Sequence, residues 1–387
     1  MVKAIKVMLI PNNVQKTKMF QYAGASRFAY NWALAREKEN YEKGGKFISD
    51  SELRKEFTKL RHSDEYAWLL NISNNVTKQA IKDACTAYKN FFKGLQKFPR
   101  FKSRKKSMPK FYQDNVKIQF SNTHVKFEGF SSSRKANKQK KNWVRLAEHG
   151  RIPTDVKYMN PRISFDGLNW WISVCVEFPD CRETLNDDGV GIDLGIKDLA
   201  VCSDGTKYKN INKSQKVKKL EKQKRRLQRS ISRSYEKNKK GESYCKTNNV
   251  IKKEKLLLKR NHRLTNIRKN YLNQTISEII NRKPRFICIE DLNVSGMMKN
   301  RHLSKAVQAQ GFFWFRKQLE YRCSDKGIQL IVADRFYPSS KLCSCCGNIK
   351  KDLKLSDRVY RCACGNMIDR DFQASINLKT YGEQFAS

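Results

Sequence analysis

The stretch Arg335–Leu378 reads RFYPSSKLCSCCGNIKKDLKLSDRVYRCACGNMIDRDFQASINL, and the interpretation of the chain starts from it. It contains a Cys-x-x-Cys-Gly turn at residues 343–347 and a tighter Cys-x-Cys-Gly turn at residues 362–365. Four thiolates at this spacing are typical of one structural Zn²⁺, because four sulfur ligands leave no open coordination position. The acids Asp369 and Asp371 follow directly and lead into a short helical pattern. We therefore interpret residues 339–366 as a zinc ribbon inserted into another domain. The acids that follow it would then belong to a site built mainly from earlier segments of the chain.

The charge of the chain indicates a polyanionic partner. The 387 residues include 80 Lys and Arg against 37 Asp and Glu, a formal charge of +43. Self-repulsion of this size destabilises a compact fold unless a polyanion compensates it, and nucleic acid is the leading candidate. An anionic membrane surface is the alternative. We expect no membrane partner, because no segment reaches the roughly 18 apolar residues of a spanning helix, and the N-terminus lacks the features of a signal peptide.

The cysteines favour a metal site over disulfides. Five of the twelve lie between residues 343 and 364, and the others are scattered singly. This distribution fits a reducing compartment, where disulfides are rare. Cys345 could replace a ligand in the first turn, but Cys343 would then have no role. We therefore predict Cys343, Cys346, Cys362 and Cys364 as the zinc ligands and Cys345 as a spare thiol.

The first half of the chain combines strands with a helical block. Residues 3–10 alternate in polarity and predict a first strand. Residues 16–94 place apolar side chains three or four apart and predict helices, whereas residues 111–180, beginning with VKIQF at 116–120, predict short strands of a small barrel. The basic loop KFPRFKSRKKSMPK at residues 97–110 interleaves Phe with Arg and Lys, which favours contact with phosphates. A solvated linker is the alternative for this loop.

The second half opens with a three-stranded meander. We predict strands at 190–194 and 198–203, a tight turn at Asp204-Gly205 and a third strand, which is how a ribonuclease H-like core begins. A helical hairpin follows at 212–280. Its segment 213–240 carries 13 Lys and Arg against two Glu, which favours nucleic-acid contact over a merely solvated face. Strands at 284–292 and 328–336 and helices at 303–324 and 372–380 complete the prediction.

Three acids stand out by their positions in these elements. Asp193 lies within an apolar strand, Glu290 ends an apolar strand, and Asp371 precedes a helix. A lone carboxylate in such surroundings is costly unless it is paired or bound to metal. Three that converge would hold Mg²⁺ or Mn²⁺ through hard oxygen ligands, and two such ions would activate a water for phosphodiester hydrolysis. The alternative is that each acid is an ordinary strand-end or helix-cap residue.

Three neighbouring acids compete with this set. Asp369 is a possible third ligand that could instead cap the final helix, and Asp198 and Asp291 lie near the other two positions. We rank all three below Asp193, Glu290 and Asp371.

Four motifs in order carry a resemblance to a known family. GIDLGIKDLAV, FICIEDLNVSGMMKN, SSKLCSCCG and CACGNMIDRDFQASINL resemble the RuvC-like segments and zinc ribbon of the TnpB (OrfB) proteins of insertion sequences, which are relatives of type V CRISPR effectors. The resemblance is dense over about 189–380. It implies an RNA-guided DNA endonuclease of a transposable element. A guide RNA from the element's end would pair with the target, the protein would check a short adjacent DNA motif, and one RuvC-like site would cut both strands.

By motif, the resemblance implies Asp193, Glu290 and Asp371 as catalytic, Mg²⁺-binding acids. It also implies guide RNA and double- and single-stranded DNA as partners, in the cytoplasm of a prokaryotic cell and associated with its nucleoid. The second turn departs from the family by being Cys-x-Cys where Cys-x-x-Cys is commoner. Gln373 stands where the family usually has Asn, beside an expected hydrogen bond of the site.

The implied fold class is a multidomain α/β protein. An OB-like β-barrel (wedge) would comprise 1–14 and 97–185, with a helical recognition domain at 15–96 inserted into it. A ribonuclease H-like (RuvC) nuclease domain would comprise 186–338 and 367–387, with the helical hairpin 212–280 and the zinc ribbon 339–366 as insertions.

Two other functions stay open. The first is a nuclease-inactive, RNA-guided DNA-binding repressor of the same descent, which loss of an acid would mark. The second is an RNA-independent RuvC-like DNA nuclease or transposase, which would not purify with RNA.

Overall fold

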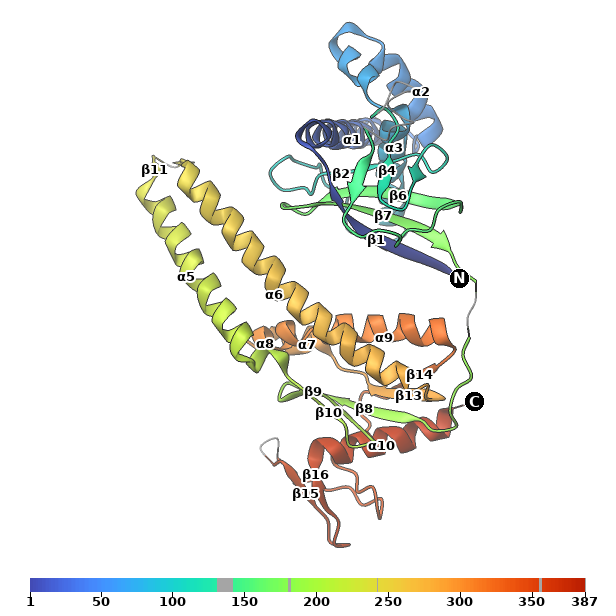
Figure 1. Ribbon diagram of the computed structural model, residues 1–387, viewed down its shortest axis with the longest axis vertical. Helices are drawn as coiled ribbons and strands as arrows, with labels where there is room; N and C mark the ends of the chain where they lie inside the picture. Colours follow the sequence, from blue (N-terminus) through green and yellow to red (C-terminus); the bar gives the residue numbers. More distant parts are fainter. Residues whose placement is uncertain (131–141, 180–181, 242, 355–356, 387) are drawn as a thin grey trace. The chain divides into compact units, whose positions relative to one another are not determined.

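The computed structural model describes residues 1–130, 142–179, 182–241, 243–354 and 357–386. The chain divides into two compact units, Met1–Pro179 and Asp180–Ser387, and Figure 1 shows both and labels many of their helices and strands.

The first unit is built on a seven-stranded sheet in the order β2-β6-β7-β1-β5-β4-β3. Its strands are β1 (Val2–Ile10), β2 (Lys110–Tyr112), β3 (Gln119–Phe120), β4 (His124–Lys126), β5 (Val144–Leu146), β6 (Tyr158–Phe165) and β7 (Trp170–Glu177). Strand β1 lies between β7 and β5 and is antiparallel to both. The strand predicted from residue 116 starts only at Gln119. The reason is that Asp114 Oδ1 accepts the N–H groups of Val116 and Lys117, each at 3.0 Å, which holds a turn there.

In the described part of the first unit, the helices lie between β1 and β2 in sequence. They are α1 (Asn13–Glu42), α2 (Asp50–Arg61), the 3₁₀ helix η1 (Asp64–Asn71) and α3 (Asn74–Phe92). Helix α1 begins with a capping box, in which Asn12 and Gln15 each accept the other's backbone N–H, and this arrangement satisfies two donors of the first turn. Buried residues of α1 and α3 share one hydrophobic core with the sheet, including Met19, Ile81 and Ile172.

The second unit contains a five-stranded sheet in the order β10-β9-β8-β13-β14. Its strands are β8 (Val190–Leu194), β9 (Asp198–Cys202), β10 (Lys207–Lys209), β13 (Phe286–Glu290) and β14 (Gln329–Ala333). Strands β8, β9 and β10 form an antiparallel meander, whereas β13 is parallel to both β8 and β14. Helix α10 (Arg370–Phe385) covers one face, and α6 (Asn248–Asn281) with α9 (Phe312–Lys326) covers the other (Figure 1).

The alternation of side chains decides which residues face α10. Ile287 and Ile289 belong to the core under α6 and α9, whereas Phe286 and Cys288 belong to the core under α10 with Leu378. Because side chains alternate along a strand, every second residue of β8 and β13 points to the α10 face.

The second unit also contains a helical hairpin and a ribbon. Helix α5 (Gln215–Lys237) follows the short η2 (Ile211–Lys213) and pairs with α6, and β11 (Lys239–Lys240) and β12 (Ser243–Tyr244) join them at the tip. Strands β15 (Val359–Arg361) and β16 (Met367–Asp369) form the ribbon hairpin before α10.

Two predicted helices in this unit differ from the structure. The helical structure predicted for 303–324 is confirmed, but it is divided into α8 (Ser304–Gln310) and α9 at Gly311, whose φ of +71° ends the first helix. Helix α7 (Val294–Lys299) precedes them. The final helix begins at Arg370 and ends at Phe385, so it is longer than the predicted 372–380. Within the described ranges, no helix has the length and apolar character needed to cross a membrane.

Candidate functional site

Two of the predicted acids lie side by side on neighbouring parallel strands. Strands β8 and β13 pair with Ile192 opposite Ile289, so Asp193 and Glu290 occupy the next positions along the two strands. Both belong to the set that alternates toward α10. Gly191 on the same face of β8 lies so close to α10 that an added Cβ would overlap the backbone of Ser375.

The third acid, Asp371, lies in the first turn of α10. Asp369 is the N-cap of this helix, and its Oδ1 accepts the N–H groups of Asp371 and Phe372, each at 3.1 Å. Asp369 also pairs with Lys207 at 3.3 Å. Burial opposes ionisation of Asp369, but the Phe372 N–H and Lys207 hold its pKa below its usual value. The cap role foreseen for Asp369 is confirmed, and its carboxylate is engaged by the helix and by Lys207.

The electrostatics tie Asp193, Glu290 and Asp371 together. Burial raises the pKa of Asp193 well above its usual value, and the negative charges of Glu290 and Asp371 raise it further. Burial also raises the pKa of Glu290; a hydrogen bond from Ser339 and the charge of Arg370 oppose the rise, and Asp371 adds to it. Asp193 and Glu290 therefore both lie in the field of neighbouring negative charges, and this repulsion is of the kind that a bound cation relieves.

The carboxylates are less tightly grouped than the ribbon thiols. Among the described residues, the one group of three or more potential ligand atoms within 4.8 Å of one another is the cysteine cluster of the ribbon.

A cavity of about 510 Å³ opens beside Glu290 and is lined by residues of 290–293 and 333–341. Asp291 also borders it, but Arg316 and Arg335 donate to its two oxygens at 2.7 and 2.5 Å. These bonds hold the pKa of Asp291 below its usual value. Asp291 is therefore committed to two guanidinium partners, which makes its carboxylate less available to a metal ion.

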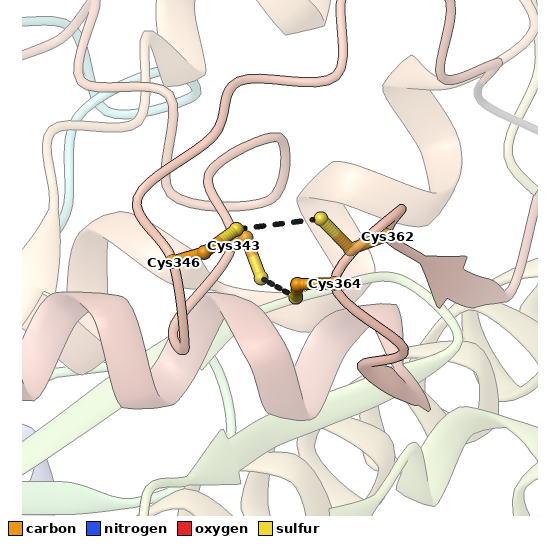
Figure 2. Close-up of side chains that lie close together, drawn as sticks. All are labelled: Cys343, Cys346, Cys362 and Cys364. Carbon is orange, nitrogen blue, oxygen red and sulfur yellow. Dashed lines mark hydrogen bonds between the residues drawn. The ribbon is translucent and has the colours of Figure 1, made fainter.

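The four predicted zinc ligands come together in the ribbon (Figure 2). Cys343 Sγ lies 3.7 Å from Cys364 Sγ, and Cys346 Sγ lies 3.5 Å from Cys362 Sγ. Sulfur atoms on a tetrahedral zinc at about 2.3 Å would be about 3.8 Å apart, so the spacing fits the ion. Cys345 is exposed and lies outside the cluster.

Glycine at the end of each turn lets the ribbon bring these sulfurs together. Gly347 has a φ of +73° and Gly365 a φ of +91°, a left-handed conformation that favours glycine. The short Cys-x-Cys turn is therefore compatible with a four-sulfur site.

Two basic surfaces are candidates for nucleic-acid contact. Most of the Lys and Arg residues of α5 are exposed, while Val217, Leu220 and Ile231 on its other side are buried. In the first unit, Arg27 and the loop residues 104–106 line a cavity of about 800 Å³. Surfaces on which positive charge predominates in this way attract a polyanion.

Lys102 lies within the basic loop of the first unit but is more enclosed than its neighbours. Its Nζ lies 3.0 Å from the centre of the Tyr30 ring. Burial, followed by the charge of Lys110, lowers the pKa of Lys102 to about 7.

Sequence reasoning did not assign a role to Ser339, Arg370 or Asn377. Ser339 donates to Glu290, and Arg370 lowers the pKa of both Asp193 and Glu290. Gln373 was expected beside a hydrogen bond of the site, but its bonds run to the ribbon. Ser339 lies in the SSKLCSCCG motif and Asn377 in the CACGNMIDRDFQASINL motif. Both residues are therefore visible in the sequence, but the groups with which they form hydrogen bonds can be identified only in the structure.

Three family models match the chain. A model described as probable transposase matches 173–301, one described as Cas12f1-like, TNB domain matches 312–378, and one described as helix-turn-helix domain matches 1–46. Residues 1–46 fold as strand β1 and the single long helix α1, so they do not form the helix-turn-helix that the description of the last model names.

Curated relatives match over most of their length. The putative RNA-guided DNA endonuclease InsQ of Escherichia coli (strain K12) is 31% identical over 93% of this chain and 87% of its own length. A putative RNA-guided DNA endonuclease of Streptomyces pristinaespiralis is 29% identical over 98% of this chain and 89% of its own length.

Solved structures share the fold. A chain of a Cas12f1–sgRNA–target DNA complex matches with a TM-score of 0.60 at 13% identity, covering 94% of this chain and 83% of that chain. The mini-RNA-guided endonuclease CRISPR-Cas_phi3 matches with a TM-score of 0.53 at 11% identity, covering 98% and 92%. The chain therefore has the α/β fold of these effectors with a zinc-ribbon-like domain. On its motifs, its matching family models and its identity to InsQ, this chain belongs to the TnpB (OrfB) family of insertion-sequence proteins.

Proposed function

We propose that this chain is an RNA-guided DNA endonuclease of an insertion sequence, with Asp193, Glu290 and Asp371 as its catalytic acids. The observation that carries the proposal is their arrangement: two acids at adjacent positions of parallel strands, and a third in the first turn of the helix that covers that face. The pKa shifts of Asp193 and Glu290 support it, because the charges of Glu290 and Asp371 raise the pKa of Asp193 and the charge of Asp371 raises the pKa of Glu290. Glu290 also borders the cavity lined by 290–293 and 333–341, and a perturbed carboxylate beside a cavity is a common mark of an active site.

The donor set fits Mg²⁺ or Mn²⁺, which prefer carboxylate oxygen. Asp193, Glu290 and Asp371 would hold the cations. Bound there, two Mg²⁺ ions supply an activated water and stabilisation of the leaving oxygen of a phosphodiester. Ser339 fixes the orientation of Glu290 through its hydrogen bond. Arg370 keeps a positive charge near the acids, which favours the approach of a phosphate.

The finer fold assignment is also part of the proposal. An antiparallel meander joined to parallel strands supports a ribonuclease H-like (RuvC) domain in the second unit. In the first unit, Gln113 Oε1, just after β2, accepts from Glu128 N, just after β4, at 2.9 Å. Because β2 and β4 lie toward opposite ends of the strand order, this contact supports closure of the sheet into an OB-like wedge barrel carrying a helical recognition insertion.

Guide RNA and target DNA are the proposed partners. The two curated relatives are named as RNA-guided DNA endonucleases, and the charge of +43 favours a polyanionic partner. Sequence reading would be delegated to base pairing, while exposed cations such as those of α5 contact the backbone.

The test is cleavage of a plasmid by the purified protein–RNA complex in Mg²⁺, after sequencing of the bound RNA to choose the target. The wild-type complex should cut a matched target next to the correct adjacent motif, and Asp193→Ala should bind it without cutting. RNA-dependent binding with no cleavage by the wild type would instead favour the repressor. Cleavage by protein freed of RNA would favour an RNA-independent nuclease.

A further inference from the structure

The first turns of α10 carry buried amide side chains that bond to the ribbon. Gln373 is 0% exposed and Asn377 is 2% exposed, and their spacing of four residues places them on one side of α10. Asp371, one of the proposed catalytic acids, lies two residues before Gln373 on the same helix. A buried amide that loses its partners costs about 1–3 kcal/mol, so these hydrogen bonds strongly restrict where α10 can lie.

Gln373 bonds to both turns of the ribbon. Its Nε2 donates to the carbonyl of Leu342, directly before the ligand Cys343, at 2.7 Å. Its Oε1 accepts from Ser344 Oγ at 3.0 Å and from Asn366 Nδ2 at 3.3 Å. The Asn366 amide also donates to Cys343 Sγ at 3.4 Å. One side chain of α10 therefore contacts the first turn directly and a zinc-ligand sulfur through one intermediate.

A second path leads from the same turn to Glu290. Asn377 Nδ2 donates to the carbonyls of Leu342 and Ser339, both at 2.7 Å. Ser339 is 4% exposed, and its Oγ donates to Glu290 Oε1. The carbonyl of Leu342 is thus shared by two amides, one near Asp371 and one connected through Ser339 to Glu290.

We propose that Gln373, Asn377 and Ser339 are positioning residues that couple zinc loading of the ribbon to the arrangement of the catalytic acids. Without zinc, the four thiols lose the bonds that hold the two turns together. Movement of residues 342–344 then breaks the buried amide bonds or carries α10 with it. Both responses displace Asp371 and release the constraint on Glu290. Zinc in the ribbon would thereby be needed for divalent-cation binding at a separate site.

The inference rests on the proposed function, because it needs the acids to hold a divalent cation. The test therefore measures cation binding directly: Mn²⁺ affinity of the full chain by electron paramagnetic resonance, with zinc content measured on the same samples. Ser339 is an outer-sphere partner of Glu290, and such partners typically change metal affinity by about 10–100-fold. Gln373→Leu should weaken Mn²⁺ binding about tenfold or more while the far-UV circular dichroism stays that of the wild type. Gln384→Leu is the matched control, because it makes the same change at an exposed position of α10 and should leave the affinity unchanged.

Two further arms do not depend on the folding of Gln373→Leu. Ser339→Ala should weaken Mn²⁺ binding with zinc retained, and Ser339→Thr, which keeps the hydroxyl, should restore it. Removal of zinc from the wild type with a zinc-selective chelator should weaken Mn²⁺ binding, and zinc addition should reverse the loss. Mn²⁺ affinity within about twofold of wild type in both variants and in the zinc-free protein would overturn the coupling alone. If Asp193→Asn bound Mn²⁺ with the same affinity as the wild type, the proposed function would be overturned as well.

Discussion

Replacing Asp193 by Asn should stabilise the protein when no divalent cation is bound. Burial raises the pKa of Asp193 well above its usual value, and the charges of Glu290 and Asp371 raise it further. At neutral pH the folded state either holds this carboxylate at a cost or keeps a proton that the unfolded chain has released. Each pKa unit of the shift costs the folded state about 1.4 kcal/mol. Uncharged Asn avoids the cost at nearly the same shape.

The pH dependence follows from the direction of the shift. Below the pKa of Asp193 in the unfolded chain, both states are protonated and the cost is absent. As the pH rises, the unfolded chain releases its proton first, so wild-type stability falls until the pH passes the folded-state pKa. The difference in Tm between Asp193→Asn and wild type should therefore widen as the pH rises above about 4, the ordinary pKa of an aspartate, and level off only above the raised folded-state pKa. For a compact unit of the size of Asp180–Ser387, each pKa unit of the shift corresponds to a difference in Tm of about 3–6 °C.

Thermal unfolding of zinc-loaded protein, with and without Mg²⁺, measures both effects. Mg²⁺ should raise the Tm of the wild type more than that of the variant, because a cation that binds only the folded acids stabilises them by mass action. The matched control is Asp187→Asn at an exposed position, whose Tm should follow the wild type at every pH. A lower Tm for Asp193→Asn across the whole pH range, or an equal response of both proteins to Mg²⁺, would refute the reasoning.

Three other changes test separate parts of the account. Cys346→Ser removes one of four sulfur ligands, so zinc content measured by atomic emission should fall below one per chain; retention of one tightly bound zinc would contradict the ligand assignment. Gly191→Ala places a Cβ against the backbone of Ser375 in α10, and overpacking of this kind costs about 1–3 kcal/mol. The Tm of the variant should therefore fall, and its Mg²⁺-dependent cleavage should weaken. An unchanged Tm would show that α10 packs less closely against β8. Arg225→Gln combined with Arg229→Gln should make the slope of log affinity for RNA against log salt less negative by roughly 1.4, about 0.7 for each phosphate that is no longer neutralised, whereas an unchanged slope would place the RNA elsewhere.

The zinc cluster could be predicted from sequence because its signals are local. Two Cys-Gly turns about 15 residues apart determine which sulfurs are available, and each turn forms within a few residues. The cap role of Asp369 is equally local, since its partners Asp371 and Phe372 are two and three residues away.

Other features depend on partners that are distant in sequence. Asp291 reads as a second acid beside Glu290, but Arg316 and Arg335, 25 and 44 residues away, pair with it. In the sequence, Gln373 is recognisable only as a departure from the family pattern. Its hydrogen bonds to the carbonyl of Leu342 and the hydroxyl of Ser344 can be identified only in the structure.

The break between α8 and α9 was missed for a different reason. The apolar pattern of 303–324 continues through Gly311, and a glycine inside a helical pattern is often tolerated. Only its left-handed backbone, with a φ of +71°, marks the end of one helix and the start of the next.

The most direct measurement of the central claim is anomalous diffraction from crystals of the RNA-bound protein soaked in Mn²⁺. We predict anomalous density in contact with the carboxylates of Asp193, Glu290 and Asp371 together, distinct from the zinc signal in the ribbon. Mn²⁺ density that contacts none or only one of these three carboxylates would contradict the account.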